Sequence, residues 1–276
     1  MANAHYLIIH YDLVDQGSEE EVLVLRATLN LMNAIFRPGL LQLGTFERDR
    51  QRMQFIFQSS APAFLLFRLF QMVATPFHLT AGIGYGEMGE DQSAIPSGKM
   101  HAQEALEQTR KHRQGIVYNG GWQEDALINM WLNLWQDLKM AQSPMQRALS
   151  FPFERHLPLY LADQMTEITW PDRDLNKIEQ LKQTVVAANP SLSYPTLNHL
   201  IHKPSKWADL LSVVSNEGLF IDHFFKKGYA TVLAEMTQTT HQNIGYHFTA
   251  GKFARERNLS AAIVWQLLRE EAVLVD

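Results

Sequence analysis

The sequence contains no cysteine among its 276 residues. This absence excludes disulfide bonds, catalysis by a thiol and zinc sites built from thiolates, and it suits a reducing cytosol. No apolar run approaches the roughly 18 residues of a membrane span. The N-terminus has no basic region followed by an apolar core, because Asp12 and Asp15 interrupt it. We therefore expect a cytoplasmic protein without a signal peptide or membrane span.

Positive charge is also scarce. The net charge is −5, from 24 Lys and Arg against 29 Asp and Glu. Residues 175–276 hold ten basic and nine acidic residues, which leaves 14 basic and 20 acidic residues for the rest of the chain. The acidic remainder is a poor partner for a polyanion, whereas residues 175–276 are not repelled by one. If nucleic acid is bound, this pattern places the contact in the last hundred residues.

Signatures of catalysis are few. No His-x-x-x-His pair is backed by a carboxylate, and no Ser-His-Asp arrangement can be argued. Asp12, at the end of a predicted strand, and Asp49, at a predicted hairpin tip, would suit Mg²⁺ as paired carboxylates. A metal-dependent nucleotide-binding or nucleotidyl enzyme using Asp12 is therefore an alternative. Arginines on both sides of Asp49 favour a solvated tip, and we expect no catalytic residue, no metal, no cofactor and no enzyme activity.

The first 121 residues alternate between strand and helix patterns. Alternating apolar residues predict strands, and apolar residues three or four apart predict helices. Strands are expected at 6–11, 41–46, 53–57, 79–88 and 115–118, and helices at 18–36, 62–72 and 99–113. The order βαββαβ, followed by αβ, predicts an α+β fold that begins with a ferredoxin-like antiparallel sheet with helices on one face.

The most patterned stretch is Leu79–Met88, in which Gly82, Gly84 and Gly86 share one face of a strand. A phosphate-binding glycine loop would need a helix immediately after the glycines, and turn residues follow here instead. We expect these glycines to permit close packing against the strand.

From Trp122 onward the pattern is helical, and four prolines divide residues 141–174 into short pieces. We therefore predict three units. These are a ferredoxin-like domain at 1–121, a helical connector at 122–174, and an all-α domain at 175–276.

Two segments of the last domain share one template. Residues 187–201 and 234–248 each have a small residue, a hydroxyl six positions later, an aliphatic ten later and an apolar residue fourteen later. A helix-turn-helix needs this spacing, because the small residue lets the helices approach and the hydroxyl caps the second helix. Two copies in one chain would let a monomer imitate the two half-sites of a dimer.

The outer face of each second helix would then be free to contact DNA. Gln and Asn are the side chains that pair with adenine edges. The candidate DNA-binding residues are Tyr194, Thr196, Asn198, His199, Lys203 and Lys206 in the first copy and Thr240, His241, Gln242, Asn243, Tyr246 and His247 in the second. Helix pairs of this kind also occur in helical domains that touch no DNA, so a protein-interaction scaffold is a further alternative.

Three stretches resemble the SatD-like family, whose N-terminal domain is similar to class III nucleotide cyclase and GGDEF-type domains. They are Tyr6-Leu-Ile-Ile-His-Tyr-Asp12, Ala81-Gly-Ile-Gly-Tyr-Gly-Glu87 and Ser97-Gly-Lys-Met-His-Ala-Gln-Glu-Ala-Leu106. The family's Gly-Asp-Glu-Phe-Gln hairpin is replaced by Glu47-Arg-Asp-Arg-Gln-Arg52. The resemblance implies a cyclase-like sheet that has lost catalysis, followed by a helix-turn-helix segment.

These observations together predict a DNA-binding transcription regulator whose degenerate cyclase-like domain serves sensing or dimerisation. The expected partners are double-stranded DNA, a second copy of the chain, and a small-molecule or nucleotide effector.

Overall fold

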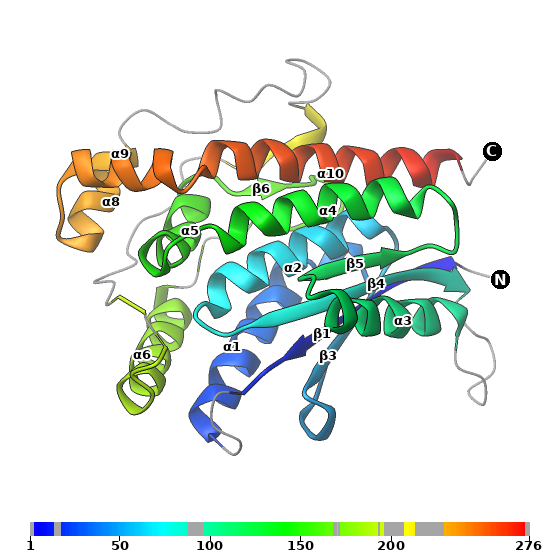
Figure 1. Cartoon of the computed structure of the whole chain (residues 1–276), viewed down its shortest axis with the longest axis horizontal. Helices are drawn as coiled ribbons and strands as arrows, with labels where there is room; N and C mark the ends of the chain where they lie inside the picture. The colour runs from blue at the N-terminus through cyan, green and yellow to red at the C-terminus, as the bar shows by residue number, and fades with distance from the viewer. Residues whose placement is uncertain are drawn as a thin grey trace.

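The computed structural model describes residues 3–13, 18–87, 96–167, 170, 172–192, 194–195, 207–212 and 229–273. These residues form a mixed α+β fold in which helices surround a five-stranded sheet (Figure 1). Within the described ranges, no helix is both long and apolar enough to cross a membrane.

The sheet has the strand order β2-β3-β1-β4-β5. Its strands are β1 (Asn3–Tyr11), β2 (Leu40–Glu47), β3 (Arg52–Phe57), β4 (Leu79–Glu87) and β5 (Ile116–Asn119). Neighbouring strands are antiparallel except for β4 and β5, which are parallel. The sheet is therefore mixed: the strands of the first six elements, β1 to β4, are antiparallel as expected, and β5 adds a parallel edge. The cause is the helix between β4 and β5, because a crossover of this kind returns the chain in the same direction.

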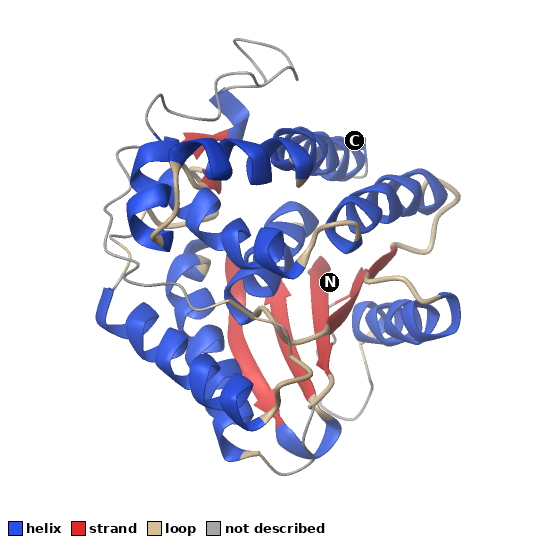
Figure 2. Ribbon diagram, turned by 60° about the vertical axis from the view of Figure 1, so that its left-hand side comes forward, coloured by secondary structure: helices blue, strands red, loops and turns tan. Residues whose placement is uncertain are grey.

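Helices cover both faces of the sheet (Figure 2). The two helices of the first six elements share one face, as expected, and the helix that follows them covers the other. Helices α1 (Glu19–Ile35) and α2 (Ser60–Ala74) pack on one face, and α3 (Ser97–His112) packs on the other. A separate apolar cluster lies between α3 and the sheet, formed by Ala4, Tyr6, Ile8, Ile56, Ala102 and Leu106. Alternate residues of β1 point to opposite faces, so Leu7 and Ile9 join the larger core on the α2 side.

The glycines of β4 permit the close approach that the sequence predicts. A Cβ atom on Gly84 would lie 2.1 Å from the backbone N of Ala102 and 2.4 Å from the carbonyl O of Gly98. Gly82 meets the backbone of the same helix, at Ala102 and Leu106. Backbone thus packs on backbone here, and no side chain fits between β4 and α3.

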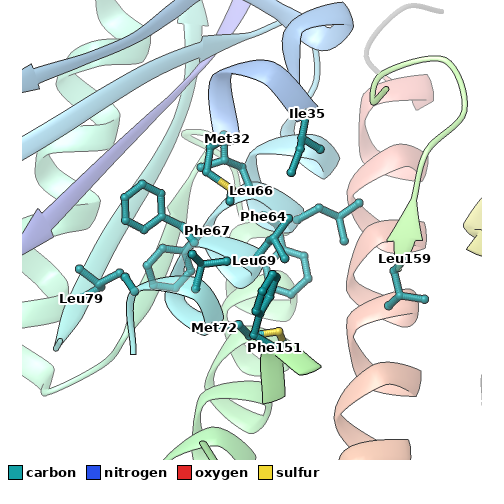
Figure 3. Packing of buried hydrophobic residues seen from close by; sticks show 14 of the residues in the cluster. Met32, Ile35, Phe64, Leu66, Phe67, Leu69, Met72, Leu79, Phe151 and Leu159 are labelled. Carbon is teal, nitrogen blue, oxygen red and sulfur yellow. The ribbon is translucent and has the colours of Figure 1, made fainter. Parts of the chain in front are cut away.

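The larger core lies around α2, whose apolar side chains point in several directions (Figure 3). Phe64, Phe67 and Phe70 are fully buried. Around α2 lie α1, α4 (Asp125–Met140), α5 (Pro144–His156) and α10 (Phe253–Val273), and α10 runs beside α4 in Figure 1. One apolar cluster therefore runs from the first strand to the last helix. The division at 121 and 174 stays a prediction, and these contacts cross both boundaries.

Two 3₁₀ turns lie in the first half, at Arg37–Gly39 and Arg48–Arg50. The remaining elements of the second half are α6 (Asp172–Ala188), α8 (Tyr229–Thr237), α9 (His241–Ala250) and the short parallel pair β6 (Leu159–Tyr160) and β7 (Ala208–Asp209). This strand pair departs from the expectation that everything after residue 122 is helical. Each strand is two residues long, so neither could produce a visible alternation.

Candidate nucleic-acid interface

The second copy of the repeat forms two helices joined by a three-residue turn. Helix α8 ends at Thr237 and α9 begins at His241. Thr240 is the N-cap of α9, and its hydroxyl accepts a hydrogen bond of 3.2 Å from the backbone N–H of Asn243. Inside the turn, the N–H of Thr239 donates to the carbonyl of Ala234 at 3.0 Å. The hydroxyl therefore caps the second helix as the template predicts, and Ala234 is buried.

The inner face of α9 is held by apolar contacts. Ile244 is fully buried. One turn later, the ring of Phe248 lies 5.3 Å from that of Phe153 in α5, 5.1 Å from Tyr229 in α8 and 5.9 Å from Phe253 in α10. Aromatic groups at these separations attract one another. Three neighbouring helices therefore fix the orientation of α9.

The outer face of α9 is polar and exposed. His241, Gln242 and Asn243 are exposed, and Tyr246 is exposed to 66%. The side-chain amide of Asn243 donates to the Thr239 hydroxyl at 2.8 Å. His247 is half-buried, and its ring lies 5.6 Å from that of Tyr246. Of the six candidates in this copy, four thus form an exposed surface, while Thr240 caps the helix and His247 is partly covered.

The first copy differs. Tyr194 is buried rather than on an outer face, and its hydroxyl donates to Glu179 at 2.9 Å and accepts from Lys182 at 2.9 Å. Burial, and next the charge of Glu179, raise the pKa of Tyr194 well above its ordinary value, so the hydroxyl stays protonated. The other candidates of this copy lie outside the described residues, namely Thr196, Asn198, His199, Lys203 and Lys206.

Asp12 follows β1, as the sequence predicts, and its carboxylate is exposed. It lies 3.3 Å from Nδ1 of His78 and 3.6 Å from Nδ1 of His10. Asp49 lies in the exposed 3₁₀ turn between β2 and β3. Among the described residues, no group of three or more His, Asp or Glu side chains is arranged to hold a metal ion.

Between α2, α4, α5 and α10 lies a buried group of charges that sequence reasoning missed. Arg68 of α2 donates to Glu256 at 2.8 Å through both Nε and Nη2, and to Glu154 at 2.8 Å. Arg257 also pairs with Glu154, and the indole N–H of Trp135 donates to Glu256 at 2.6 Å. An arginine within the apolar run Ala63–Phe70 was the available signal, since a buried charge needs partners.

The pairing sets the ionisation of this group. Burial alone would raise the pKa of Glu256, but the charge and hydrogen bonds of Arg68 outweigh it and lower the pKa to about 2. Burial lowers the pKa of Lys139 to about 8, although the charge of Glu256 opposes this effect. Glu256 therefore remains a carboxylate at neutral pH and fixes α10 against α2.

A chain of hydrogen bonds leads from Lys139 in α4 to the end of α9. Lys139 Nζ donates to Ser150 Oγ at 3.1 Å, and Ser150 Oγ lies 3.3 Å from Gln142 Oε1. Gln142 Nε2 donates to the carbonyl of Gly251, the C-cap of α9, at 2.9 Å. All three side chains are buried. The position of α9 is thus tied to α4 by polar contacts as well as by its apolar face.

Comparisons with protein-family models, with curated proteins and with solved structures find no match for this chain.

Proposed function

We propose that the chain is a DNA-binding transcription regulator in which α8 and α9 form a helix-turn-helix and α9 enters the major groove. The observation that carries the proposal is the exposed face of α9, where His241, Gln242, Asn243 and Tyr246 lie on a helix whose other side is anchored. A helix with a fixed inner face and an exposed polar outer face meets the geometric demand of groove recognition.

The chemistry of this face supports contact with base edges. Gln242 and Asn243 carry the amide groups that pair with the N6 and N7 atoms of adenine. Tyr246 offers an exposed ring and a hydroxyl to bases or sugars. Positive charge adjoins the helix at Lys252 and Arg255, both exposed, which could contact phosphates.

We infer that the first half is a ferredoxin-like, cyclase-like unit that serves sensing or dimerisation. The support is the order of β1 to β4 in the sheet, β2-β3-β1-β4, with α1 and α2 on one face. The split β-α-β arrangement has this order. The resemblance to the SatD-like family, which rests on the three sequence stretches given above, belongs to the same proposal.

The direct test is an electrophoretic mobility shift with random-sequence DNA at low salt, where phosphate contacts are strongest. We expect binding, and selection of bound sequences should give a preferred site. The double variant Gln242→Ala, Asn243→Ala should change that site, each lost pairing being worth about 1–3 kcal/mol of discrimination. Gln180→Ala, an exposed glutamine on α6, is the matched control and should leave the site unchanged.

A second variant separates phosphate contacts from base contacts. Lys252 has a positive φ of 53°, so Lys252→Gly removes the charge without straining the backbone. Binding should weaken evenly across sequences, and the salt slope should fall by about 1. Absence of binding at low salt would contradict the proposal and favour a scaffold that binds another protein. An unchanged site in the double variant would show that α9 does not contact bases.

A further inference from the structure

Two neighbouring cavities lie where β4 begins and α3 and α4 end. They measure about 420 and 180 Å³ and share His78, Gln136 and Met140 as lining residues. We call the two neighbouring cavities together the α4 groove. The larger cavity adds side chains from the ends of β1 and α3, and the smaller adds side chains from α2 and α5. Together they are large enough for a small organic ligand.

The α4 groove is cationic in a chain of net negative charge. Arg110 and Arg113 line the larger cavity, and Lys139 and Arg147 line the smaller. Among the described residues that line either cavity, Asp12 is the one carboxylate. A concentration of one sign of charge in a recess attracts a ligand of the opposite sign.

The groups around His10 show the same imbalance. Burial lowers the pKa of the His10 ring, and the charge of Arg110 lowers it further. Asp12 opposes these effects, while Arg52 and His78 add to them. Cationic side chains therefore converge on this end of β1 with a single acid to balance them.

Three buried polar atoms on residues that line the α4 groove have no hydrogen-bond partner in the described part of the chain. They are the hydroxyl of Thr80 and the side-chain oxygens of Gln71 and Gln136. Thr80 and Gln136 are exposed to only 8% and 7%. A buried polar group without a partner is costly, and a ligand in the cavity would supply one. The hydroxyl can donate to an anion, and the amide oxygens can accept from a ligand hydroxyl or amine.

The smaller cavity is partly apolar. Pro76, Phe77, Leu79 and Met140 line it beside Lys139. The two cavities therefore differ in what they would accommodate, with a charged group favoured in the larger and a ring or short chain favoured in the smaller.

We propose that the α4 groove binds a small phosphate monoester, with its dianion beside Arg110, Arg113 and Thr80 and its apolar part beside Phe77 and Met140, and that its occupancy acts on α9. The route to α9 is the chain from Lys139 through Ser150 and Gln142 to the carbonyl of Gly251. The apolar part of the ligand would lie in the smaller cavity, which Lys139 lines, and would change the surroundings of this first group in the chain. The consequence of this action for DNA binding rests on the function proposed above, whereas the binding site and the effect on α9 do not.

Phenyl phosphate is the probe for the site, because it joins a dianion to a ring. Isothermal titration calorimetry with the full chain should show one bound molecule, with phenol binding at least tenfold more weakly because it lacks the dianion. Two variants remove one contact each without harming the fold. Arg113→Gly suits the positive φ of 56° at that position, and Thr80→Val removes a hydroxyl without a described partner.

Each of these variants should weaken phenyl phosphate binding about tenfold or more while the melting temperature holds or rises. Lys111→Ala is the matched control, since it removes an exposed cation from the same helix end that does not line the groove. It should bind like the wild type. Absence of phenyl phosphate binding, equal binding of phenol, or wild-type affinity in both variants would overturn the site.

The action on α9 is measured without DNA, by hydrogen exchange of the amides of residues 244–250. Saturating phenyl phosphate should slow their exchange about threefold or more. Ser150→Ala breaks the hydrogen-bonded chain outside the groove and should abolish this response while keeping affinity within about twofold. Unchanged exchange in the saturated wild type would overturn the coupling. Because no DNA is present, this result is independent of whether α9 binds DNA.

Discussion

The two faces of the sheet are packed in opposite ways. On the α2 side, large buried side chains such as Phe55, Phe64 and Phe67 fill the space. On the α3 side, Gly82 and Gly84 leave no space to fill, and backbone meets backbone. Bulky side chains can enclose charged groups, and the α2 side encloses several. Stability on the α2 side therefore includes a contribution from the pairing of charges, whereas under α3 close backbone contact is combined with a small apolar cluster.

The largest effect is expected from breaking the charge pairing. Arg68→Met leaves Glu256 without its bidentate partner inside the core. Removal of one partner of a buried pair costs about 3–5 kcal/mol, because an uncompensated charge remains. Urea unfolding should show this loss. Arg269→Met, at an exposed arginine of α10, is the control and should change the free energy of unfolding by less than about 0.5 kcal/mol. If Arg68→Met and Arg269→Met change the free energy of unfolding equally, the buried pairing contributes nothing to stability.

The next largest effect is a pH dependence of stability, which arises from a histidine on the α2 side of the sheet. Burial lowers the pKa of His5 to about 4, and Glu271, 3.6 Å away, opposes the shift. The unfolded chain therefore takes up this proton before the folded chain does. The contribution of neutral, buried His5 to the free energy of unfolding is complete above about pH 6.5. It is lost as the pH falls to about 4, and its size is roughly 3 kcal/mol.

Unfolding free energies at pH 7 and pH 4 measure this contribution. Between pH 7 and pH 4 the free energy of unfolding should fall by roughly 3 kcal/mol less in His5→Gln than in the wild type. His112→Gln, at an exposed histidine that ends α3, should retain the full loss. If His5→Gln loses as much as the wild type, the burial of His5 does not govern the acid response.

The shape of the α3 side is tested by Gly84→Ala. The added Cβ meets backbone atoms at 2.1 and 2.4 Å, which cannot move as side-chain ends can. We expect destabilisation near the upper end of the roughly 1–3 kcal/mol that overpacking costs. The control is Gly245→Ala in α9, where a Cβ meets nothing within 4 Å. It should stabilise the fold by roughly 0.5–1 kcal/mol. If both variants destabilise the protein, the cause would be the loss of glycine's backbone freedom and not the contacts of the added Cβ atom.

The smallest effect concerns the start of α2. The backbone N–H of Ser60 donates to Glu271 of α10 at 2.6 Å, and the Ser60 hydroxyl also donates to this carboxylate. Glu271 thus caps α2 from a distant part of the chain, where the N-cap residue Ser59 makes no side-chain capping bond. Glu271→Ala should cost about 1 kcal/mol in thermal unfolding, and Glu107→Ala on the exposed surface of α3 should cost less.

Local patterns predicted local structure well. Alternation located β1, β3 and β4, and the hydroxyl of Thr240 caps a helix as expected. The glycine face of β4 indicated close packing, and α3 provides it. The strands, the cap and the glycine face are each defined by residues close together in the sequence, which is why the sequence alone indicates them.

Features that depend on distant residues were not predictable in the same way. The alanines of α3 define an apolar stripe, but nothing local states which face of the sheet that stripe covers. Tyr194 fits an exposed position by spacing, yet Glu179 and Lys182 bury its hydroxyl. The partners of Arg68 and the lining of the α4 groove come from segments scattered along the chain.

The link between Arg68 and Glu256 has a consequence for the order of folding. The two residues are separated by 188 positions in the sequence. At about 5–20 residues per second, the ribosome adds Glu256 roughly 10 to 40 s after Arg68. Glu154, the other partner of Arg68, is only 86 positions away and is therefore added earlier. The complete pairing of Arg68, and with it the final packing of α2 against α10, can form only after α10 has been synthesised.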